Sequence, residues 1–341
     1  MNKVVVRLVA LAVAVVVIVG LVVLGRGKEP QEMRFALVPK SVGHTYWEGV
    51  RQGMEAEARQ RGVKAVFQGP PEASVEQQLK IIESLITQGY DGIGISPSDS
   101  KAVEEIIGRA INKGIAVVTF DSDSKDSRRL VYIGTDNREA GRIAGRLMID
   151  LLGAKPQAQA GDETFLVQII GGQPGAENLN ERMEGFKEAV ADVNISLADD
   201  LYNEENPDKA LQVAENAINA HPDLDGFFCA NAFGGPGVAP AIEDAIGRGQ
   251  LEPHQIRVVA FDTTPDILNY IEEGVIDCTL AQQTQRMGKL SIEHLLRFAQ
   301  QYQELGRFNP PPEGEDVIDT GVAVVRPEDV PQYRPEPKEG D

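Results

Sequence analysis

Apolar residues in this chain follow two alternating patterns along most of its length. Short, mainly apolar runs, such as 34–38 and 115–120, have the length of buried strands. Between them lie longer segments with apolar residues at helical spacing, as at Trp47, Val50 and Met54, and these segments end at glycines. The alternation is typical of βαβ units and predicts an α/β fold with parallel sheets covered by helices on both faces.

Two series of such elements follow one another. The first predicts strands at 34–38, 63–67, 92–96 and 115–120, with helices between them. The second predicts strands at 165–170, 226–230, 257–261 and 277–281, with helices near 181–190, 207–220, 236–247 and 265–273. A last helix at 285–303 and a late strand at 320–325 complete the pattern. With 341 residues the chain is long enough for two domains with separate cores, so we expect two doubly wound lobes.

The N-terminus carries the longest apolar run of the chain. Residues 8–24 are 17 consecutive apolar residues, preceded by Lys3 and Arg7 and followed by a polar break at 25–30. This length exceeds the usual core of a signal peptide and just reaches the roughly 17 residues that span a bilayer. We therefore expect residues 1–27 to be an export signal or an uncleaved membrane anchor. The rest of the chain should lie in the periplasm or on the outer face of the cytoplasmic membrane.

Charge and cysteine content exclude several classes of site. The formal net charge of −19 argues against nucleic-acid binding, which requires a basic surface. The two cysteines, Cys229 and Cys278, each lie in an apolar run and are expected to be buried free thiols. Because no spacing typical of a metal site is present, we expect neither a metal nor a cofactor.

Aromatic and acidic residues follow the strands of the first series. Tyr46 and Trp47 begin the first helix, and two flat rings at a cleft suit the C–H face of a sugar, although periodicity also favours a core position for Trp47. Asp121 follows the strand at 115–120, where its carboxylate could accept hydroxyl hydrogen bonds or cap a loop. Ligands of open α/β sheets bind beyond the carboxyl ends of the strands, so these residues are candidate contacts.

The second series offers polar residues at the corresponding places. Asn231, Asp262 and Gln282 each come directly after an apolar run, and amide groups match the mixed donor and acceptor character of hydroxyls. The glycine-rich turn at 171–175 matches neither a dinucleotide fingerprint nor a P-loop, so nucleotide binding is weakly supported.

Residues 33–325 resemble the type I periplasmic sugar-binding proteins typified by ribose-binding protein. The segments that carry the resemblance, in this order and spacing, are 90–99, 115–121, 133–137, 181–186, 220–223 and 258–262. The resemblance implies two lobes that exchange chain at three hinge crossings, near 135–136, 282–283 and 318–319. The first lobe would then comprise 33–135 plus 283–318 and the second 136–282 plus 319–325, followed by a tail at 326–341 with little to bury.

The resemblance also implies ligand contacts by position. It assigns His44, Tyr46 and Trp47 to the wall of the first lobe and Asp121 to the acidic ligand residue. The second lobe and the hinge would contribute polar contacts at Asn231, Asp262 and Gln282. Ser122 and Asn180 are the two remaining expected contacts. They stand where ribose receptors carry arginine, which puts ribose itself in doubt.

These features predict an uncharged ligand and a transport partner. We expect a monomeric binding protein that closes on a monosaccharide or small polyol and delivers it to the permease and ATPase of an ABC importer. The alternative is an anchored receptor for a sugar or a signalling furanose that feeds a sensor kinase or chemoreceptor; Asp121-Ser122-Asp123 is similar to a run in a furanose receptor.

Two other classes of protein fit the sequence less well. Asp121 and Asp262 could be imagined as the carboxylate pair of a glycosidase, but nothing else supports catalysis, so we expect no enzyme. The same fold forms the sensor half of sugar-responsive repressors, which carry a basic helix-turn-helix ahead of the lobes. Here an apolar segment occupies that place, which argues against a repressor.

Overall fold

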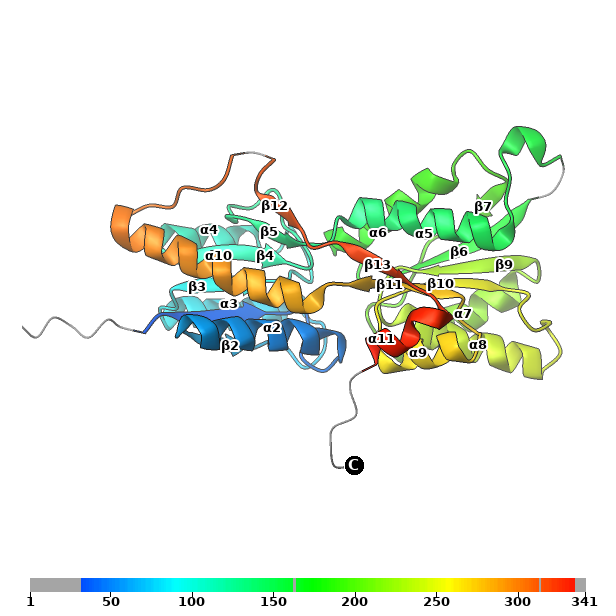
Figure 1. The fold of residues 1–341 in the computed structure, drawn as a ribbon, viewed down its shortest axis with the longest axis horizontal. Coiled ribbons are helices and arrows are strands. Elements are labelled where there is room, and N and C mark those ends of the chain that lie inside the picture. Colours follow the sequence, from blue (N-terminus) through cyan, green and yellow to red (C-terminus); the bar gives the residue numbers. More distant parts are fainter. Residues whose placement is uncertain (1–31, 162–163, 313, 335–341) are drawn as a thin grey trace, which may run out of the picture. The chain divides into compact units, whose positions relative to one another are not determined.

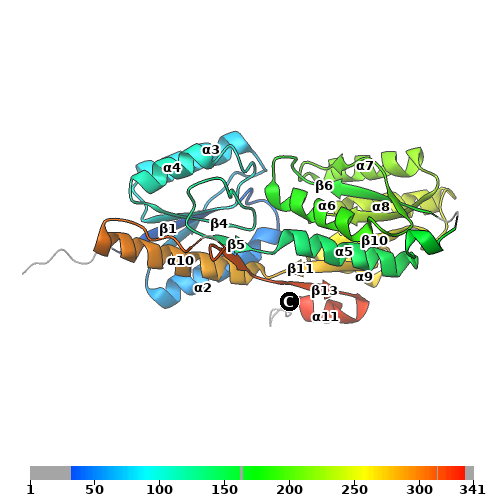
Figure 2. The ribbon, with the colours of Figure 1, turned by 90° about the horizontal axis from the view of Figure 1, so that it is seen from above.

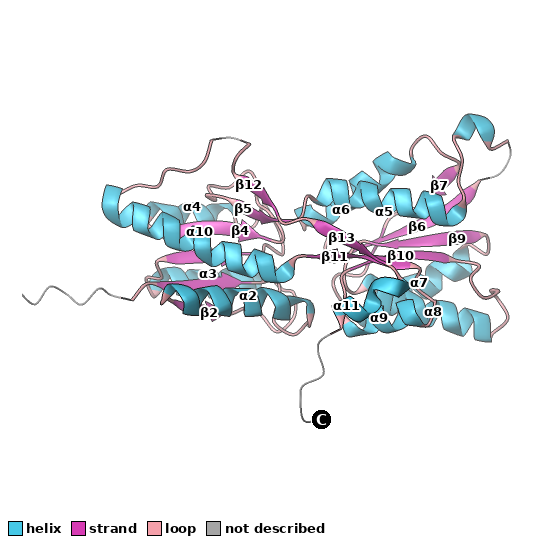
Figure 3. Ribbon diagram, viewed as in Figure 1, coloured by secondary structure: helices cyan, strands magenta, loops and turns pink. Residues whose placement is uncertain are grey.

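The structure, a computed structural model, describes residues 32–161, 164–312 and 314–334 (Figure 1). From Arg34 onward it contains two α/β lobes, each built on its own sheet. Helices lie on both faces of each sheet (Figure 3), which confirms the predicted fold class. Within these ranges no helix is long and apolar enough to cross a membrane. The signal or anchor expected at 1–27 lies outside the described residues.

The first lobe is built on a six-stranded parallel sheet. Its strands are β1 Arg34–Val38, β2 Lys64–Phe67, β3 Gly92–Ile95, β4 Ala116–Phe120, β5 Tyr132–Gly134 and β12 Val317–Asp319. They pair in the order β12-β5-β4-β3-β1-β2, so the direction of winding reverses between β1 and β3. One face is covered by α2 (Tyr46–Arg61) and α10 (Thr284–Leu305), and the other by α3 (Val75–Thr87) and α4 (Glu104–Asn112) (Figure 2).

The second lobe repeats this arrangement with one antiparallel edge strand. Its strands are β6 Phe165–Gly171, β7 Ile195–Leu197, β8 Leu201–Tyr202, β9 Leu224–Cys229, β10 Arg257–Phe261, β11 Cys278–Gln282 and β13 Val322–Val325. They pair in the order β13-β11-β10-β9-β6-β7, with β8 on β6 and β13 antiparallel to β11. One face carries α5 (Asn137–Leu152) and α6 (Glu177–Val190); the other carries α7 (Pro207–Ala220), α8 (Gly234–Gly247) and α9 (Pro265–Glu272).

Burial follows from the parallel sheets. Every residue of β4 is buried, because helices cover both faces of this strand, and the expected thiols Cys229 and Cys278 are both buried. The helices α5 and α6 approach closely at Gly141, where an added Cβ would lie 2.0 Å from the carbonyl oxygen of Arg182. Glycine is required there by space rather than by backbone conformation.

The chain passes between the two sheets three times. The crossings join β5 to α5, β11 to α10 and β12 to β13. They are tied to one another: the Thr135 hydroxyl donates to Gln282 Oε1 at 2.9 Å, and the Thr320 amide donates to the Gly134 carbonyl at 2.7 Å. A small set of hydrogen-bonded backbone segments therefore connects the lobes, as a hinge requires.

Several elements differ from the sequence-based expectations. The short strands β5, β7, β8 and β12 were not predicted, because two or three residues carry too little periodicity to be recognised. The expectation that residues beyond Arg326 bury little is wrong for part of that segment. After a 3-10 turn at Pro327–Asp329, α11 (Val330–Tyr333) packs on α9, and Val330 is fully buried in the core of the second lobe. Tyr333 packs against the same core, and the Arg334 guanidinium donates to Asn269 Oδ1 at 2.8 Å, so these contacts add to that of Val330.

Candidate ligand-binding site

Polar side chains from both sheets line one small cavity within the two-lobed body. Of the nine residues expected to contact ligand, the structure brings seven to this cavity: His44, Tyr46, Trp47, Asp121, Asn231, Asp262 and Gln282. Most of them stand at or just beyond the carboxyl end of a parallel strand, where side chains are free of sheet packing. Four further polar residues, which the sequence had not singled out, share the cavity: Lys40, Asn178, Arg182 and Glu205.

Asp121 ends β4 in a strained backbone conformation. Its φ of 59° lies in the left-handed region, which is unfavourable for a residue with a Cβ. The turn directs its buried carboxylate into the cavity, where Oδ1 accepts from the Tyr46 hydroxyl at 2.6 Å and Oδ2 from the Ser96 hydroxyl at 2.8 Å. Burial and the charge of Asp121 raise the pKa of Tyr46 well above its ordinary value, so Tyr46 is held as a neutral donor.

Asp262 occupies the equivalent place at the end of β10. Its φ of 74° is again left-handed, and its Oδ1 accepts from Gln282 Nε2 at 2.9 Å. Burial raises the pKa of Asp262 to about 6, and the nearby positive charge of Arg182 opposes that rise. Two strained aspartates, one from each lobe, therefore aim acceptor oxygens at the same space, and strain of this kind is concentrated at functional sites.

Arg182 is fully committed to protein contacts. It is 1% exposed and donates to Asn137 Oδ1 at 2.8 Å, the Ala230 carbonyl at 2.9 Å and Gln282 Oε1 at 2.9 Å. Its guanidinium lies 4.0 Å from the centre of the Phe261 ring. One local signal marks Arg182 in the sequence: a charged residue stands at helical spacing among the buried apolar positions of α6.

Trp47 takes both positions that the sequence left open, since it packs in the core and also lines the cavity. Trp47 is 6% exposed and packs edge-on against Phe120, with ring centroids 6.2 Å apart, yet it also lines the cavity. The Tyr46 ring meets it edge-on at 4.8 Å. The ring centroids of His44 and Phe233 are 4.2 Å apart. Burial lowers the pKa of His44 to about 4, so its imidazole is uncharged at neutral pH.

Two expected residues do not reach this cavity. The Ser122 side chain is fully buried away from it, because the chain turns sharply at Asp121 and successive side chains diverge, and its hydroxyl finds no hydrogen-bond partner among the described residues. Asn180 lies two positions from Arg182 on α6, which places it on a different side of that helix. Its side-chain amide donates to the Pro174 carbonyl at 2.8 Å on the outer surface.

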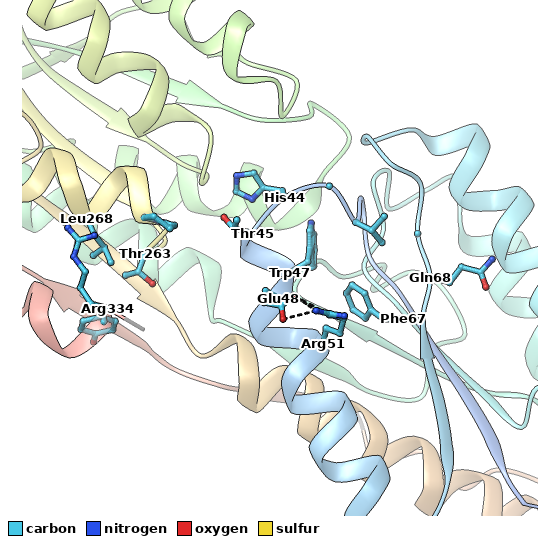
Figure 4. A pocket seen from close by; sticks show the side chains of 15 residues that line it. His44, Thr45, Trp47, Glu48, Arg51, Phe67, Gln68, Thr263, Leu268 and Arg334 are labelled. Carbon is cyan, nitrogen blue, oxygen red and sulfur yellow. Dashed lines mark hydrogen bonds and ion pairs between the residues drawn. The ribbon is translucent and has the colours of Figure 1, made fainter. Parts of the chain in front are cut away.

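The cavity is smaller than a sugar in this arrangement of the lobes. Its volume is about 30 Å³, room for two or three water molecules. His44 and Trp47 also border a neighbouring groove of about 870 Å³, lined by residues of both lobes that include Phe67, Thr263 and Leu268 (Figure 4). A ligand could therefore enter only if the lobes separate or side chains move.

Metal chemistry finds no support in the described part of the chain. No group of three or more histidine, cysteine, aspartate or glutamate side chains is placed there to hold an ion. What the cavity offers instead is a set of hydrogen-bond acceptors and donors next to flat aromatic rings. That combination can bind a small polar molecule with many hydroxyl groups.

Comparisons with known proteins give a consistent family. A family model described as "Periplasmic binding protein domain" matches residues 35–303. The ribose import binding protein RbsB of Bacillus subtilis (strain 168) is 28% identical over 263 residues, which cover 77% of this chain and 80% of the relative.

Solved structures agree with that match. An ABC transporter solute binding protein from Burkholderia graminis C4D1M, in complex with D-arabinose, is 34% identical with a TM-score of 0.76, covering 89% of this chain and 98% of that one. A structure described as the XylFII–LytSN complex is 26% identical with a TM-score of 0.74, covering 88% of this chain and all of that one (100%). Each match extends over both lobes.

Proposed function

Because the chain belongs to the periplasmic binding protein family, we propose that it is the extracytoplasmic solute-binding protein of an ABC importer. The lobes would close around a monosaccharide or a related small polyol and deliver it to a permease and its ATPase. The observation that carries the proposal is that Asp121 and Asp262, one from each sheet, line a single cavity with aromatic and amide side chains.

The chemistry of the cavity supports a sugar ligand. Hydroxyl groups donate well to carboxylates, and Asp121 and Asp262 are both buried, where such hydrogen bonds are strongest. Gln282 and Asn231 provide amides, and Trp47 provides an apolar surface for ring carbons. The relatives point the same way, since one is described as a ribose import binding protein and another was solved with D-arabinose.

The site supports binding rather than turnover. The relatives described above carry the names of binding proteins. Both carboxylates accept hydrogen bonds from the protein: Asp121 from Tyr46 and Ser96, and Asp262 from Gln282. These bonds fix the carboxylates as acceptors for a bound ligand. A receptor of this kind needs no pair of groups tuned for proton transfer.

A thermal-shift screen tests the proposal. The purified protein would be melted with pentoses, hexoses, polyols and, as contrasting classes, nucleotides and amino acids. At 100 times its Kd a ligand adds roughly 2.7 kcal/mol to the native state, so at least one sugar or polyol should raise the melting temperature clearly. A shift from nucleotides or amino acids, with none from any sugar, would overturn the sugar proposal.

A receptor that signals through a partner protein is the second candidate. Its support is the similarity to the structure described as the XylFII–LytSN complex. Cross-linking of the protein in its native membrane, followed by identification of the captured partners, separates the two. Capture of a permease and an ATPase supports the importer, whereas capture of a sensor kinase supports the receptor.

A further inference from the structure

Beside Arg182, the cavity holds a second buried cation, Lys40, which no sequence pattern marks. Lys40 follows β1, is 2% exposed, and reaches across from the first lobe to the second. Its Nζ lies 3.1 Å from Asn178 Oδ1, 3.5 Å from Glu205 Oε1 and 3.9 Å from Asp121 Oδ2. An ammonium group has three N–H donors, and three acceptors surround this one.

Glu205 owes its position to an ordered and strained loop between β8 and α7. Both Glu204 and Glu205 have left-handed φ values, 52° and 57°, which side-chain-bearing residues adopt at a cost. The Glu204 amide donates to the Gly172 carbonyl at 3.2 Å, and the Glu205 amide donates to Asn203 Oδ1 at 2.9 Å. The loop thus presents the Glu205 side chain, only 9% exposed, to the cavity.

A reciprocal amide pair holds this loop in place. Asn203 Nδ2 donates to Asn231 Oδ1 at 2.9 Å, and Asn231 Nδ2 donates back to Asn203 Oδ1 at 3.1 Å. Gly172 leaves room for the pair, because a Cβ there would lie 2.5 Å from Asn231 Nδ2. Asn231 Oδ1 also accepts from the Gly234 amide at 3.1 Å, so the pair ties the loop that carries Glu205 to the start of α8 and fixes where the Glu205 side chain lies.

The charges that line the cavity are almost balanced, and of its two cations Lys40 makes fewer and longer contacts than Arg182. Two cations, Lys40 and Arg182, face three carboxylates, Asp121, Glu205 and Asp262, for a formal sum of −1. Arg182 is fixed by three hydrogen bonds and by the ring of Phe261. An anionic ligand would therefore have to recruit Lys40, whose charge Glu205 already engages.

We propose that Glu205 is a selectivity residue that excludes anionic ligands by pairing with Lys40 across the two lobes. The cavity would accordingly accept uncharged sugars and reject sugar acids and sugar phosphates, whose charge would meet a site that is already negative. The inference rests on the proposed function and defines the ligand class of that same site.

The test compares ligands that differ in one charged group. Calorimetry would measure the Kd of D-galactose against D-galacturonate, D-glucose against D-glucuronate, and D-ribose against D-ribose 5-phosphate. Glu205→Gln keeps the shape of the side chain and an acceptor for Lys40 but removes the charge. We expect it to improve binding of at least one anionic sugar relative to its neutral counterpart by tenfold or more.

Two further variants locate the effect. Glu204→Gln is the matched control, since the neighbouring Glu204 has the same backbone conformation but pairs with Lys209 at the surface, and it should leave the ratio unchanged. Lys40→Gln combined with Glu205→Gln should abolish the gain, because the freed ammonium is then missing. Wild-type preference for the anionic sugars, or an unchanged ratio in Glu205→Gln, would overturn the proposal.

Inorganic phosphate provides a readout that does not depend on the sugar. Phosphate should raise the melting temperature of Glu205→Gln but not that of the wild type or of Glu204→Gln. If no sugar binds any variant while phosphate behaves as expected, the proposed function fails and the role of Glu205 stands. If phosphate stabilises the wild type and Glu205→Gln equally, Glu205 does not control access to Lys40. Weaker binding of neutral sugars in Glu205→Gln without any gain for anions would make Glu205 a direct ligand contact instead.

Discussion

Replacing Asp262 by asparagine should raise stability and weaken ligand binding at the same time. The two side chains have nearly the same shape, and the remaining carbonyl oxygen can still accept from Gln282 Nε2, which now lies 2.9 Å from Asp262 Oδ1. The change therefore removes a buried charge without leaving its protein partner unsatisfied. Opposite effects on folding and binding are expected when a site keeps a group for its ligand rather than for its fold.

The pKa of Asp262 sets the size of the stability effect. Burial raises this pKa from 3.8 to about 6, and a difference of this size corresponds to about 3 kcal/mol of disfavoured ionisation. An acid with a raised folded-state pKa stabilises the protein fully below its unfolded value, and that contribution is lost as the pH rises through the folded value. The variant should accordingly be more stable than the wild type by up to about 3 kcal/mol above pH 6, with the difference vanishing near pH 4.

Binding should change in the other direction. A hydrogen bond from a ligand hydroxyl to a charged acceptor contributes about 1.5–3 kcal/mol, more than one to a neutral amide. If the second oxygen of Asp262 receives such a bond, its loss raises the Kd by roughly ten- to 150-fold. For the wild type, affinity should also fall as the pH drops below about 6, because protonation removes the same charge.

Urea unfolding followed by Trp47 fluorescence at pH 7.5 and pH 4.5 measures the stability effect, and calorimetry with the best ligand of the screen measures affinity. Asp150→Asn, which changes an exposed carboxylate on α5, serves as the control and should shift stability by less than about 0.5 kcal/mol. A less stable Asp262→Asn at pH 7.5, or unchanged affinity, would show that this carboxylate is structural.

Three further outcomes are expected. Ligand should change the emission of Trp47, the single tryptophan, and reduce the radius of gyration in small-angle scattering; neither change at saturation would argue against lobe closure on this cavity. Arg182→Met should lower the free energy of unfolding by about 3–5 kcal/mol, because three buried acceptors lose their donor. A urea midpoint equal to that of the wild type would refute this. Deleting residues 326–341 should cost about 1.5–3 kcal/mol in the same assay through loss of buried Val330, whereas an unchanged midpoint would mean that α11 contributes nothing.

The strands and helices with strong periodicity could be predicted from sequence. Helix α7 was expected at 207–220 and is found at Pro207–Ala220, because proline at its first position and an apolar face mark both its start and its course. The long parallel strands could be predicted because strands covered by helices on both faces must be continuously apolar. Asp121 and Asp262 followed from their place after such strands.

The remaining part of the cavity depends on contacts between residues far apart in sequence. Lys40 and Glu205 are 165 positions apart, and no local pattern distinguishes either from the many surface lysines and glutamates. The left-handed turns at Glu204 and Glu205 carry no glycine to mark them. Arg182 differs only in standing on an apolar helix face, a signal that becomes meaningful once its three acceptors are known.

By itself the sequence determined the α/β class, the two series of elements and the acidic residues at the strand ends, because periodicity and strand ends are local properties of the chain. Only the tertiary structure decided that Ser122 and Asn180 lie away from the cavity and that Lys40, Arg182 and Glu205 line it. The direction of a side chain after a sharp turn, and the partner that neutralises a buried charge, depend on how distant segments pack. Those choices are made in three dimensions, where burial makes an unpaired charge costly and so fixes which groups must meet.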